Sequence, residues 1–163
     1  RFDENDARAL GRTASGVRGI NIEDDDEVIG MIAYDPTAED AAAHIILVVS
    51  EHGYGKRSDF DEYRKTNRGG KGVKTLNITE KTGALVAMKN VTDVNDLMII
   101  NRSGLTIRMA VSDIKVAGRA TQGVRLINIK DGDSIAAISA VNKSEEDAPE
   151  VQDETQDNEQ NLN

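Results

Sequence analysis

The sequence predicts an all-β protein made of small antiparallel sheets that stack radially or as a solenoid. Three observations support this prediction. A pattern of roughly fifty residues recurs three times along the 163-residue chain. Short apolar runs rich in β-branched residues are followed by glycine-containing turns, and no segment has a convincing helical period. With four strands expected in each repeat, the pattern is typical of propeller-like blades.

The repeat is clearest around a glycine–arginine pair. Residues 11–22 (GRTASGVRGINI) lie 107 positions before residues 118–129 (GRATQGVRLINI), and most aligned positions are identical. Residues 67–78 (NRGGKGVKTLNI) fit the same alignment, 51 positions before the third copy. The chain is therefore expected to divide into blades at 1–43, 44–91 and 92–143, with the first strand of the first blade missing.

Each repeat is expected to form its strands in the same order. The apolar runs 45–49 and 97–100 each precede a turn, at Gly53 or Gly104, and then a second extended segment. Third strands are expected at 73–78 and 124–129, and closing strands at 28–33, 85–88 and 135–138.

Turn residues separate these strands. Gly16, Gly72 and Gly123 occupy one position of the repeat, which predicts a turn with positive φ in every copy. Residues 36–43 are expected to form a loop or a short helical turn between the first two copies.

Charge is distributed unevenly along the chain. The net charge is −9, but residues 144–163 hold eight acids and no Lys or Arg. Residues 53–91 hold nine bases and four acids, whereas residues 1–43 hold four bases and eleven acids. This asymmetry favours a nucleic-acid face in the basic stretch. The acidic tail, 144–163, has few apolar residues and is expected to be disordered.

Composition excludes several kinds of site. The chain has no Cys and two His, so disulfides, thiol nucleophiles, iron–sulfur clusters and Cys- or His-based metal sites are not expected, and a reducing compartment is favoured. The acids at 23–27 lack calcium-loop spacing, and the Gly-Lys pairs lack the Walker pattern. No membrane span or leader is expected. No catalytic constellation can be assembled.

The repeated motif resembles the C-terminal domain of the bacterial DNA gyrase A subunit. Its signature Gly-Arg-x-x-x-Gly-Val-Arg-x-Ile stands at 11–20 and again at 118–127. Residues 53–57 with Tyr63 and Arg64 resemble the penultimate blade of that family, and residues 116–124 resemble the last. The resemblance covers residues 1 to about 141 and includes an acidic tail. It implies a β-pinwheel of four-stranded antiparallel blades, of which three are expected here where the family typically has six.

One family motif is matched only in part. Arg68, Gly69, Gly70, Lys71 and Gly72 match the last five positions of the family heptapeptide Gln-Arg-Arg-Gly-Gly-Lys-Gly. In the family this heptapeptide, the box, stands in the first blade, whereas the match here lies in the second copy. Residues 68–72 are therefore called the box-like turn and are not identified as the box itself.

The resemblance implies that the disc wraps double-stranded DNA around a basic rim and so supports ATP-dependent negative supercoiling by a type II topoisomerase. Cations that recur at blade spacing suit this role, because phosphate contacts position DNA without reading its sequence. The residues expected to bind DNA are Arg12, Arg18, Lys56, Arg57, Arg64, Lys65, Arg68, Lys71, Lys74, Arg108, Arg119 and Arg125.

The remaining expectations follow from the same resemblance. The cleavage tyrosine belongs to a separate N-terminal domain of the family, and no cofactor is expected in this segment, with ATP and Mg²⁺ acting elsewhere in the holoenzyme. The expected partners are the other gyrase A blades, the N-terminal domain and gyrase B in an A2B2 complex. The expected location is the bacterial cytoplasm, at the chromosome. Two alternatives stay open: the equivalent domain of the topoisomerase IV A protein, and a propeller-like protein-interaction module without DNA binding.

Overall fold

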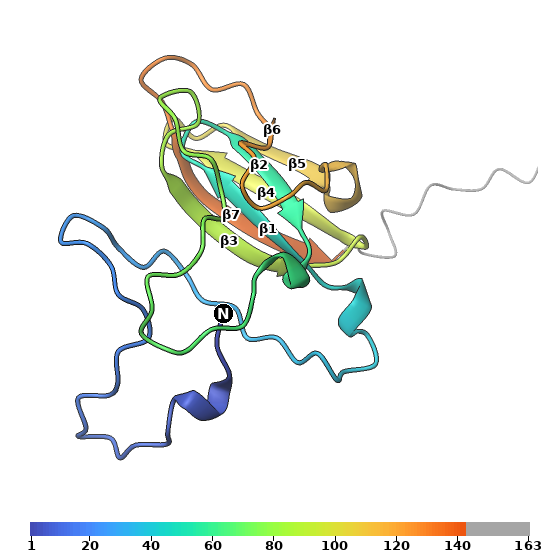
Figure 1. Ribbon diagram of the computed structural model, residues 1–163. Helices are drawn as coiled ribbons and strands as arrows, with labels where there is room; N and C mark the ends of the chain where they lie inside the picture. Colours follow the sequence, from blue (N-terminus) through green and yellow to red (C-terminus); the bar gives the residue numbers. More distant parts are fainter. Residues whose placement is uncertain (143–163) are drawn as a thin grey trace, which may run out of the picture.

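The chain forms two small antiparallel sheets joined by long connections (Figure 1). The computed structural model describes residues 1–142, and the predicted disorder of the acidic tail lies outside them. The strands are β1 (Ile45–Ser50), β2 (Tyr54–Ser58), β3 (Leu85–Val91), β4 (Asn95–Asn101), β5 (Thr106–Ala110), β6 (Val124–Arg125) and β7 (Ile135–Asn142). Four short 3₁₀ turns, η1 (Glu4–Asp6), η2 (Ala41–Ala43), η3 (Phe60–Glu62) and η4 (Val111–Asp113), complete the regular structure of the described residues. The all-β prediction is confirmed.

The strand β1 forms the centre of the molecule because both of its faces are buried. Its odd-numbered residues, Ile45, Leu47 and Val49, pack in one core with Leu97 and Ile99 of β4. Its even-numbered residues, Ile46 and Val48, pack in a second core with Phe60 and Leu76. Because side chains alternate across a strand, a continuous apolar run suits a strand with a core on each side.

The first sheet takes its strands from two repeats. Its order is β3-β1-β2-β6, and β6 belongs to the third repeat in sequence. Tyr54 of β2 is in register with Arg125 of β6, and Gly55 with Val124. The second sheet has the order β5-β4-β7, with β5 as an edge strand. The expectation that each repeat builds its own four-stranded blade is therefore wrong, because the third strand of a repeat pairs with the repeat before it.

The first repeat, residues 1–43, forms no strand, which corrects the strand expected at 28–33. Residues 29–33 instead run beside β3 and β7 and line with them a cavity of about 460 Å³. No strand among residues 1–142 pairs with this segment. Residues 28–33 have no sheet of their own repeat to join.

The segment 73–78 forms no strand either, and 124–129 is a strand only over its first two residues. In the described part of the chain, residues 73–78 join neither sheet. The predicted positive φ is confirmed at Gly16 (79°), Gly72 (80°) and Gly123 (76°). The helical turn expected within 36–43 is η2.

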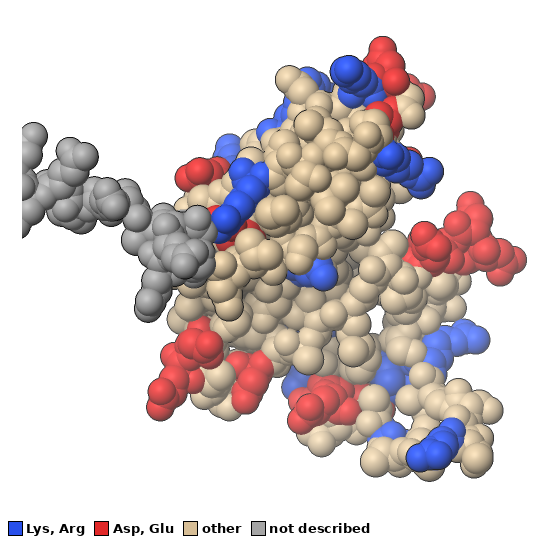
Figure 2. All heavy atoms as spheres, turned by 180° about the vertical axis from the view of Figure 1, so that it is seen from behind, with Lys and Arg blue, Asp and Glu red and all other residues tan. Residues whose placement is uncertain are grey.

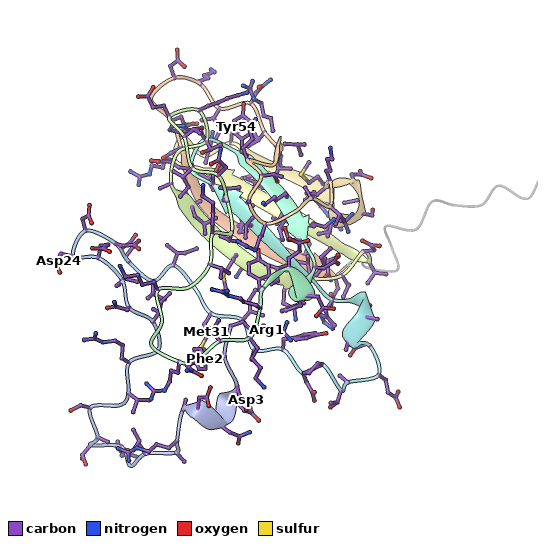
Figure 3. The ribbon with its side chains drawn as sticks, in the orientation of Figure 1. Arg1, Phe2, Asp3, Asp24, Met31 and Tyr54 are labelled. Carbon is purple, nitrogen blue, oxygen red and sulfur yellow. The ribbon has the colours of Figure 1, made fainter. Side chains whose placement is uncertain are left out.

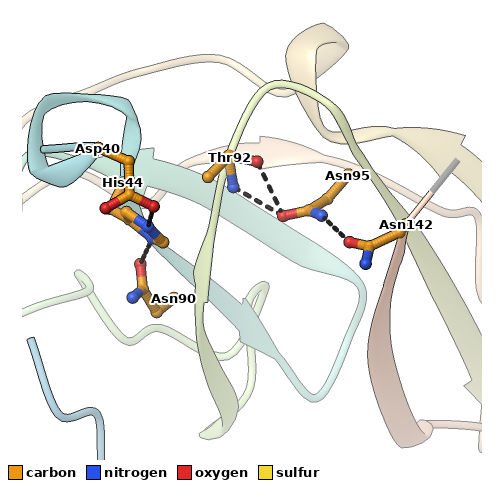
Figure 4. A network of polar contacts seen from close by, with 6 residues as sticks. All are labelled: Asp40, His44, Asn90, Thr92, Asn95 and Asn142. Carbon is orange, nitrogen blue, oxygen red and sulfur yellow. Dashed lines mark hydrogen bonds and ion pairs between the residues drawn. The ribbon is translucent and has the colours of Figure 1, made fainter.

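Side-chain hydrogen bonds tie strand ends to the loops beside them (Figure 4). The ring nitrogens of His44 lie 3.0 Å from the Asn90 Oδ1 atom and 3.1 Å from the Asp40 Oδ2 atom. Asn95 donates to Asn142 at 2.8 Å and so joins the start of β4 to the end of β7. Within residues 1–142, no helix has the length and apolar character needed to cross a membrane.

Candidate nucleic-acid interface

One cation in each repeat is held by an asparagine three residues later. The pairs are Arg18 with Asn21 at 3.3 Å, Lys74 with Asn77 at 3.1 Å and Arg125 with Asn128 at 2.9 Å. The three cations align with one another in the repeat, and so do the three asparagines. Successive copies are 56 and then 51 residues apart. All three cations are exposed. We call Arg18, Lys74 and Arg125 the rim cations.

A second aligned set of arginines contacts the backbone at the rim cations of the preceding repeat. The Arg68 guanidinium donates to the carbonyl oxygen of Arg18 at 2.6 Å. The Arg119 guanidinium makes the same contact with the carbonyl oxygen of Lys74, at 2.9 Å. Each of these arginines therefore lies beside the rim cation of the preceding repeat. The resulting row is Arg18, Arg68, Lys74, Arg119 and Arg125, which we call the rim row.

An aromatic residue fixes the last member of the row. The Tyr54 hydroxyl accepts hydrogen bonds from Arg125 at 2.9 Å and 3.2 Å, and the guanidinium lies 5.4 Å from the centre of the Tyr54 ring. The hydrogen bond from Arg125 lowers the pKa of Tyr54, although burial of the side chain opposes this shift. Lys81 lies 5.4 Å from the same ring.

Lys56 and Arg57 are buried, which corrects their expected role as phosphate contacts. The Lys56 ammonium donates to the carbonyl oxygens of Gly118 and Arg119, both at 2.6 Å, and of Thr121 at 3.0 Å. The Arg57 side chain is bound to the carbonyl oxygens of Ser112 and Ile114 and to Asp93. Buried cations need such partners, so both side chains join the second repeat to the third.

The contact of Arg57 with the next repeat recurs at Arg1, although of the aligned arginines only Arg57 is buried. Arg1 aligns with Arg57, and its guanidinium donates to the carbonyl oxygens of Phe60, at 2.8 Å, and Tyr63. In both cases the aligned arginine donates to carbonyl oxygens in or next to the 3₁₀ turn of the next repeat, η3 for Arg1 and η4 for Arg57. Arg108, the third aligned arginine, is bound to Asp96 on the neighbouring strand β4.

The other cations expected at the interface lie in different surroundings. Arg12 and Arg64 are exposed. Lys71 lies 4.0 Å from Glu23, with both side chains largely exposed, and Lys65 forms an ion pair with Asp3. Exposed pairs of this kind contribute little to stability and are easily exchanged for a phosphate.

The Asp3 carboxyl should report on its contact with Lys65. Hydrogen bonds from Lys65 and Asn5 lower the pKa of Asp3 from 3.8 to about 2. Because the folded-state pKa is depressed, the stabilising contribution of this carboxylate is fully present above pH 3.8 and is lost as the pH falls through about 2. We expect Lys65→Ala to return the Asp3 pKa towards its ordinary value in an NMR titration, and the Asp35 pKa, which depends on Thr37, to stay unchanged. An unaltered Asp3 titration would mean that Lys65 is not its partner.

The box-like turn is tied to the first repeat. The backbone N–H of Gly69 donates to the carbonyl oxygen of Gly19 at 2.9 Å, and the carbonyl oxygen of Gly70 accepts from the N–H of Asn21 at 3.0 Å. The turn therefore places Arg68 beside Arg18, and the Gly69 amide is engaged in this contact.

Cations and acids are interspersed at the surface. On the face seen in Figure 2, groups of both signs lie mainly toward the edges of the molecule. Asp24 lies at the tip of a loop that extends away from the sheets (Figure 3). Within residues 1–142, no group of three or more His, Cys, Asp or Glu side chains is placed to hold a metal ion.

Sequence reasoning missed the residues that orient the rim cations. Asn21, Asn77 and Asn128 were visible as an aligned position of the repeat, and that recurrence was the available signal. Tyr54 carried no such signal, because its contact with Arg125 joins residues 71 positions apart.

Comparison with known proteins gives a consistent result. A family model described as "DNA gyrase C-terminal domain, beta-propeller" matches residues 1–35, 44–92 and 95–142. The chain is 47% identical to the DNA gyrase A subunit of Staphylococcus aureus strain NCTC 8325 over 162 residues, which is 99% of this chain and 17% of that protein. It is 46% identical over 146 residues to the DNA gyrase A subunit of Staphylococcus epidermidis strain ATCC 12228, which is 90% of this chain and 16% of that protein. The chain thus spans about a sixth of the length of these relatives.

Two solved structures have the same fold. A DNA gyrase A C-terminal domain matches with a TM-score of 0.74 and 22% identity, over 85% of this chain and 45% of that one. A C-terminal domain of DNA topoisomerase IV matches with a TM-score of 0.74 and 19% identity, over 86% of this chain and 42% of that one.

Proposed function

The chain belongs to the DNA gyrase C-terminal domain, beta-propeller family, and from this premise we propose that it binds double-stranded DNA along its rim row as part of the DNA gyrase A subunit. The bound duplex bends around the rim, and this wrap supports ATP-dependent negative supercoiling by the complete type II topoisomerase.

The observation that carries the proposal is the recurrence of the rim cations. One exposed cation stands at the same position in each of three repeats, and each is oriented by the same asparagine contact. Duplex DNA carries a phosphate charge about every 1.7 Å of its axis, so cations spaced by one repeat can follow it and release counterions at each contact. Contacts of this kind bind without selecting a sequence, which suits a protein that must act at many sites.

The other components of the reaction are proposed to lie elsewhere. The cleavage tyrosine, ATP and Mg²⁺ belong to other parts of the holoenzyme, whose further members are the remaining blades, the N-terminal domain and gyrase B in an A2B2 complex. The proposed location is the bacterial cytoplasm, at the chromosome. Sequence identity favours gyrase over topoisomerase IV as the source of this chain, because the 46–47% identical relatives are gyrase A subunits.

Replacing the three rim cations tests the proposal. We expect the triple variant Arg18→Gln, Lys74→Gln, Arg125→Gln to weaken binding to a duplex by at least about tenfold at moderate salt. The slope of log affinity against log salt concentration should become shallower by about 3, because each lost phosphate contact removes close to one released counterion. Fluorescence anisotropy with a labelled duplex at several salt concentrations measures both quantities.

A matched control distinguishes the loss of cations in the rim row from an equal change in net charge elsewhere on the surface. The variant Lys89→Gln, Arg102→Gln, Lys130→Gln removes the same charge from exposed residues outside the rim row and should leave the salt slope nearly unchanged. Equal losses in the two variants would reduce the effect to net charge. No duplex binding by the unaltered chain would support the protein-interaction alternative.

A further inference from the structure

Two cations from different repeats converge on one buried tyrosine. The Lys81 ammonium lies 5.4 Å from the centre of the Tyr54 ring, and the Arg125 guanidinium lies at the same distance. Tyr54 is 5% exposed, whereas both cations are exposed. A cation within about 6 Å of an aromatic face is attracted by the ring. The tyrosine therefore holds a pair of positive charges at the surface, and Lys81 shares it with the last member of the rim row.

The turn that carries Lys81 is fixed to the first sheet. Thr82 is fully buried, and its hydroxyl accepts a hydrogen bond from the backbone N–H of Thr79 at 3.0 Å. The Thr82 carbonyl oxygen accepts from the N–H of His52, in the turn between β1 and β2, at 2.9 Å. Because Tyr54 begins β2, the backbone on both sides of the contact is held by the same hairpin.

The pairing of Lys81 with Tyr54 is particular to this place in the chain. The position of Lys81 holds Asp25 in the first repeat and Gly132 in the third. The position of Tyr54 holds Leu105 in the third repeat. A lysine here is therefore not needed to build the repeat, and the alignment of the repeats gives no signal for it.

The charge of the pair is not offset by acidic side chains. Within residues 1–142, neither Lys81 nor Arg125 forms an ion pair with a carboxylate. The hydrogen bond from Arg125, with smaller contributions from the charges of both cations, lowers the pKa of the Tyr54 hydroxyl. Two like charges held at one neutral ring repel each other, and an anion beside them lowers that energy. The surface at Tyr54 is therefore suited to phosphate groups.

We propose that Lys81 binds a backbone phosphate of duplex DNA beside the one bound by Arg125, and that Tyr54 positions both cations. This inference rests on the duplex binding proposed above and extends the rim row by one residue. A free lysine side chain loses much rotamer freedom when it binds. The Tyr54 ring restrains the ammonium before DNA arrives, so less of that entropy is lost on binding.

Lys81→Gln tests the phosphate contact in the full chain. We expect the affinity for a labelled duplex to fall by about five- to tenfold at about 0.1 M salt. The slope of log affinity against log salt concentration should become shallower by about 1, because one counterion fewer is released. Lys89→Gln makes the same change at an exposed position of β3 and should leave both quantities nearly unchanged. Fluorescence anisotropy at several salt concentrations measures them.

Two variants of Tyr54 test its positioning role. Tyr54→Phe keeps the aromatic ring, so Lys81→Gln in that background should lower the affinity by as much as it does in the wild type. Tyr54→Leu removes the ring, and Lys81→Gln should then lower the affinity by less than about twofold. Because Tyr54 is buried, circular dichroism establishes that each variant is folded before binding is measured.

The outcomes separate this inference from the proposed function. A salt slope that Lys81→Gln leaves unchanged, while the triple rim variant loses affinity, would overturn the inference and leave duplex binding intact. Absence of duplex binding by the unaltered chain would remove both. Equal losses in Lys81→Gln and Lys89→Gln would reduce the effect to net charge. NMR shifts of the Tyr54 ring on adding inorganic phosphate, without any effect of Lys81→Gln on duplex affinity, would assign the site to a free anion instead.

Discussion

Replacing Lys56 with methionine is expected to lower the free energy of unfolding by about 2–4 kcal/mol. The Lys56 side chain is fully buried, and its ammonium binds three carbonyl oxygens of the turn 118–121 together with the Thr121 hydroxyl. Methionine fills much of the same volume but donates no hydrogen bond, so these acceptors lose their partner. Chemical denaturation followed by circular dichroism measures the change.

The control for this variant is Lys89→Met, which makes the same change at an exposed position of β3. It should alter the free energy of unfolding by less than about 0.5 kcal/mol.

Burial lowers the pKa of Lys56 to about 8, so the folded state binds this proton less tightly than the unfolded state does. The stability difference between wild type and Lys56→Met should therefore increase as the pH rises from about 8 towards 10.5. Equal stability of the two methionine variants would mean that the buried ammonium does not hold the repeats together.

Gly123→Ala should destabilise the junction between the second and third repeats by about 2–4 kcal/mol. Two separate costs add at this position. The backbone has a φ of 76°, which an alanine adopts only with strain. An added Cβ would also lie well inside van der Waals contact with the carbonyl oxygen of Gly55 on β2, so β6 would have to move away from the sheet.

Gly16→Ala separates the two costs. Gly16 aligns with Gly123 and has almost the same φ, 79°, but no atom lies within 4 Å of an added Cβ. Its substitution should therefore cost only the backbone strain, about 1 kcal/mol. Thermal or chemical unfolding of both variants gives the comparison. A cost at Gly123 no greater than that at Gly16 would show that close approach to β2 contributes nothing.

Local sequence was sufficient for the strands whose pattern is strongest. The runs 45–49 and 97–100 became β1 and β4, and the glycine turns formed where the repeat placed them. The repeat alignment also identified the rim cations, because residues at one aligned position take the same place in each copy. A recurrent pattern of this kind reflects contacts within a repeat and between neighbouring repeats, and both are encoded by short segments.

Other features depend on pairings that short segments do not encode. Residues 28–33 and 73–78 have strand-like patterns, but a strand needs a partner edge, and among residues 1–142 neither segment joins a sheet. Lys56 and Arg57 look like solvent-facing cations in an alternating strand. They are buried because a segment some sixty residues later lies over that edge and offers its carbonyl oxygens. The amino-acid sequence by itself thus determined the repeat, the central strands and the cations that recur. Only the tertiary structure decided which sheet each strand joins and which cations are buried, because both depend on hydrogen bonds between backbone groups far apart in the chain.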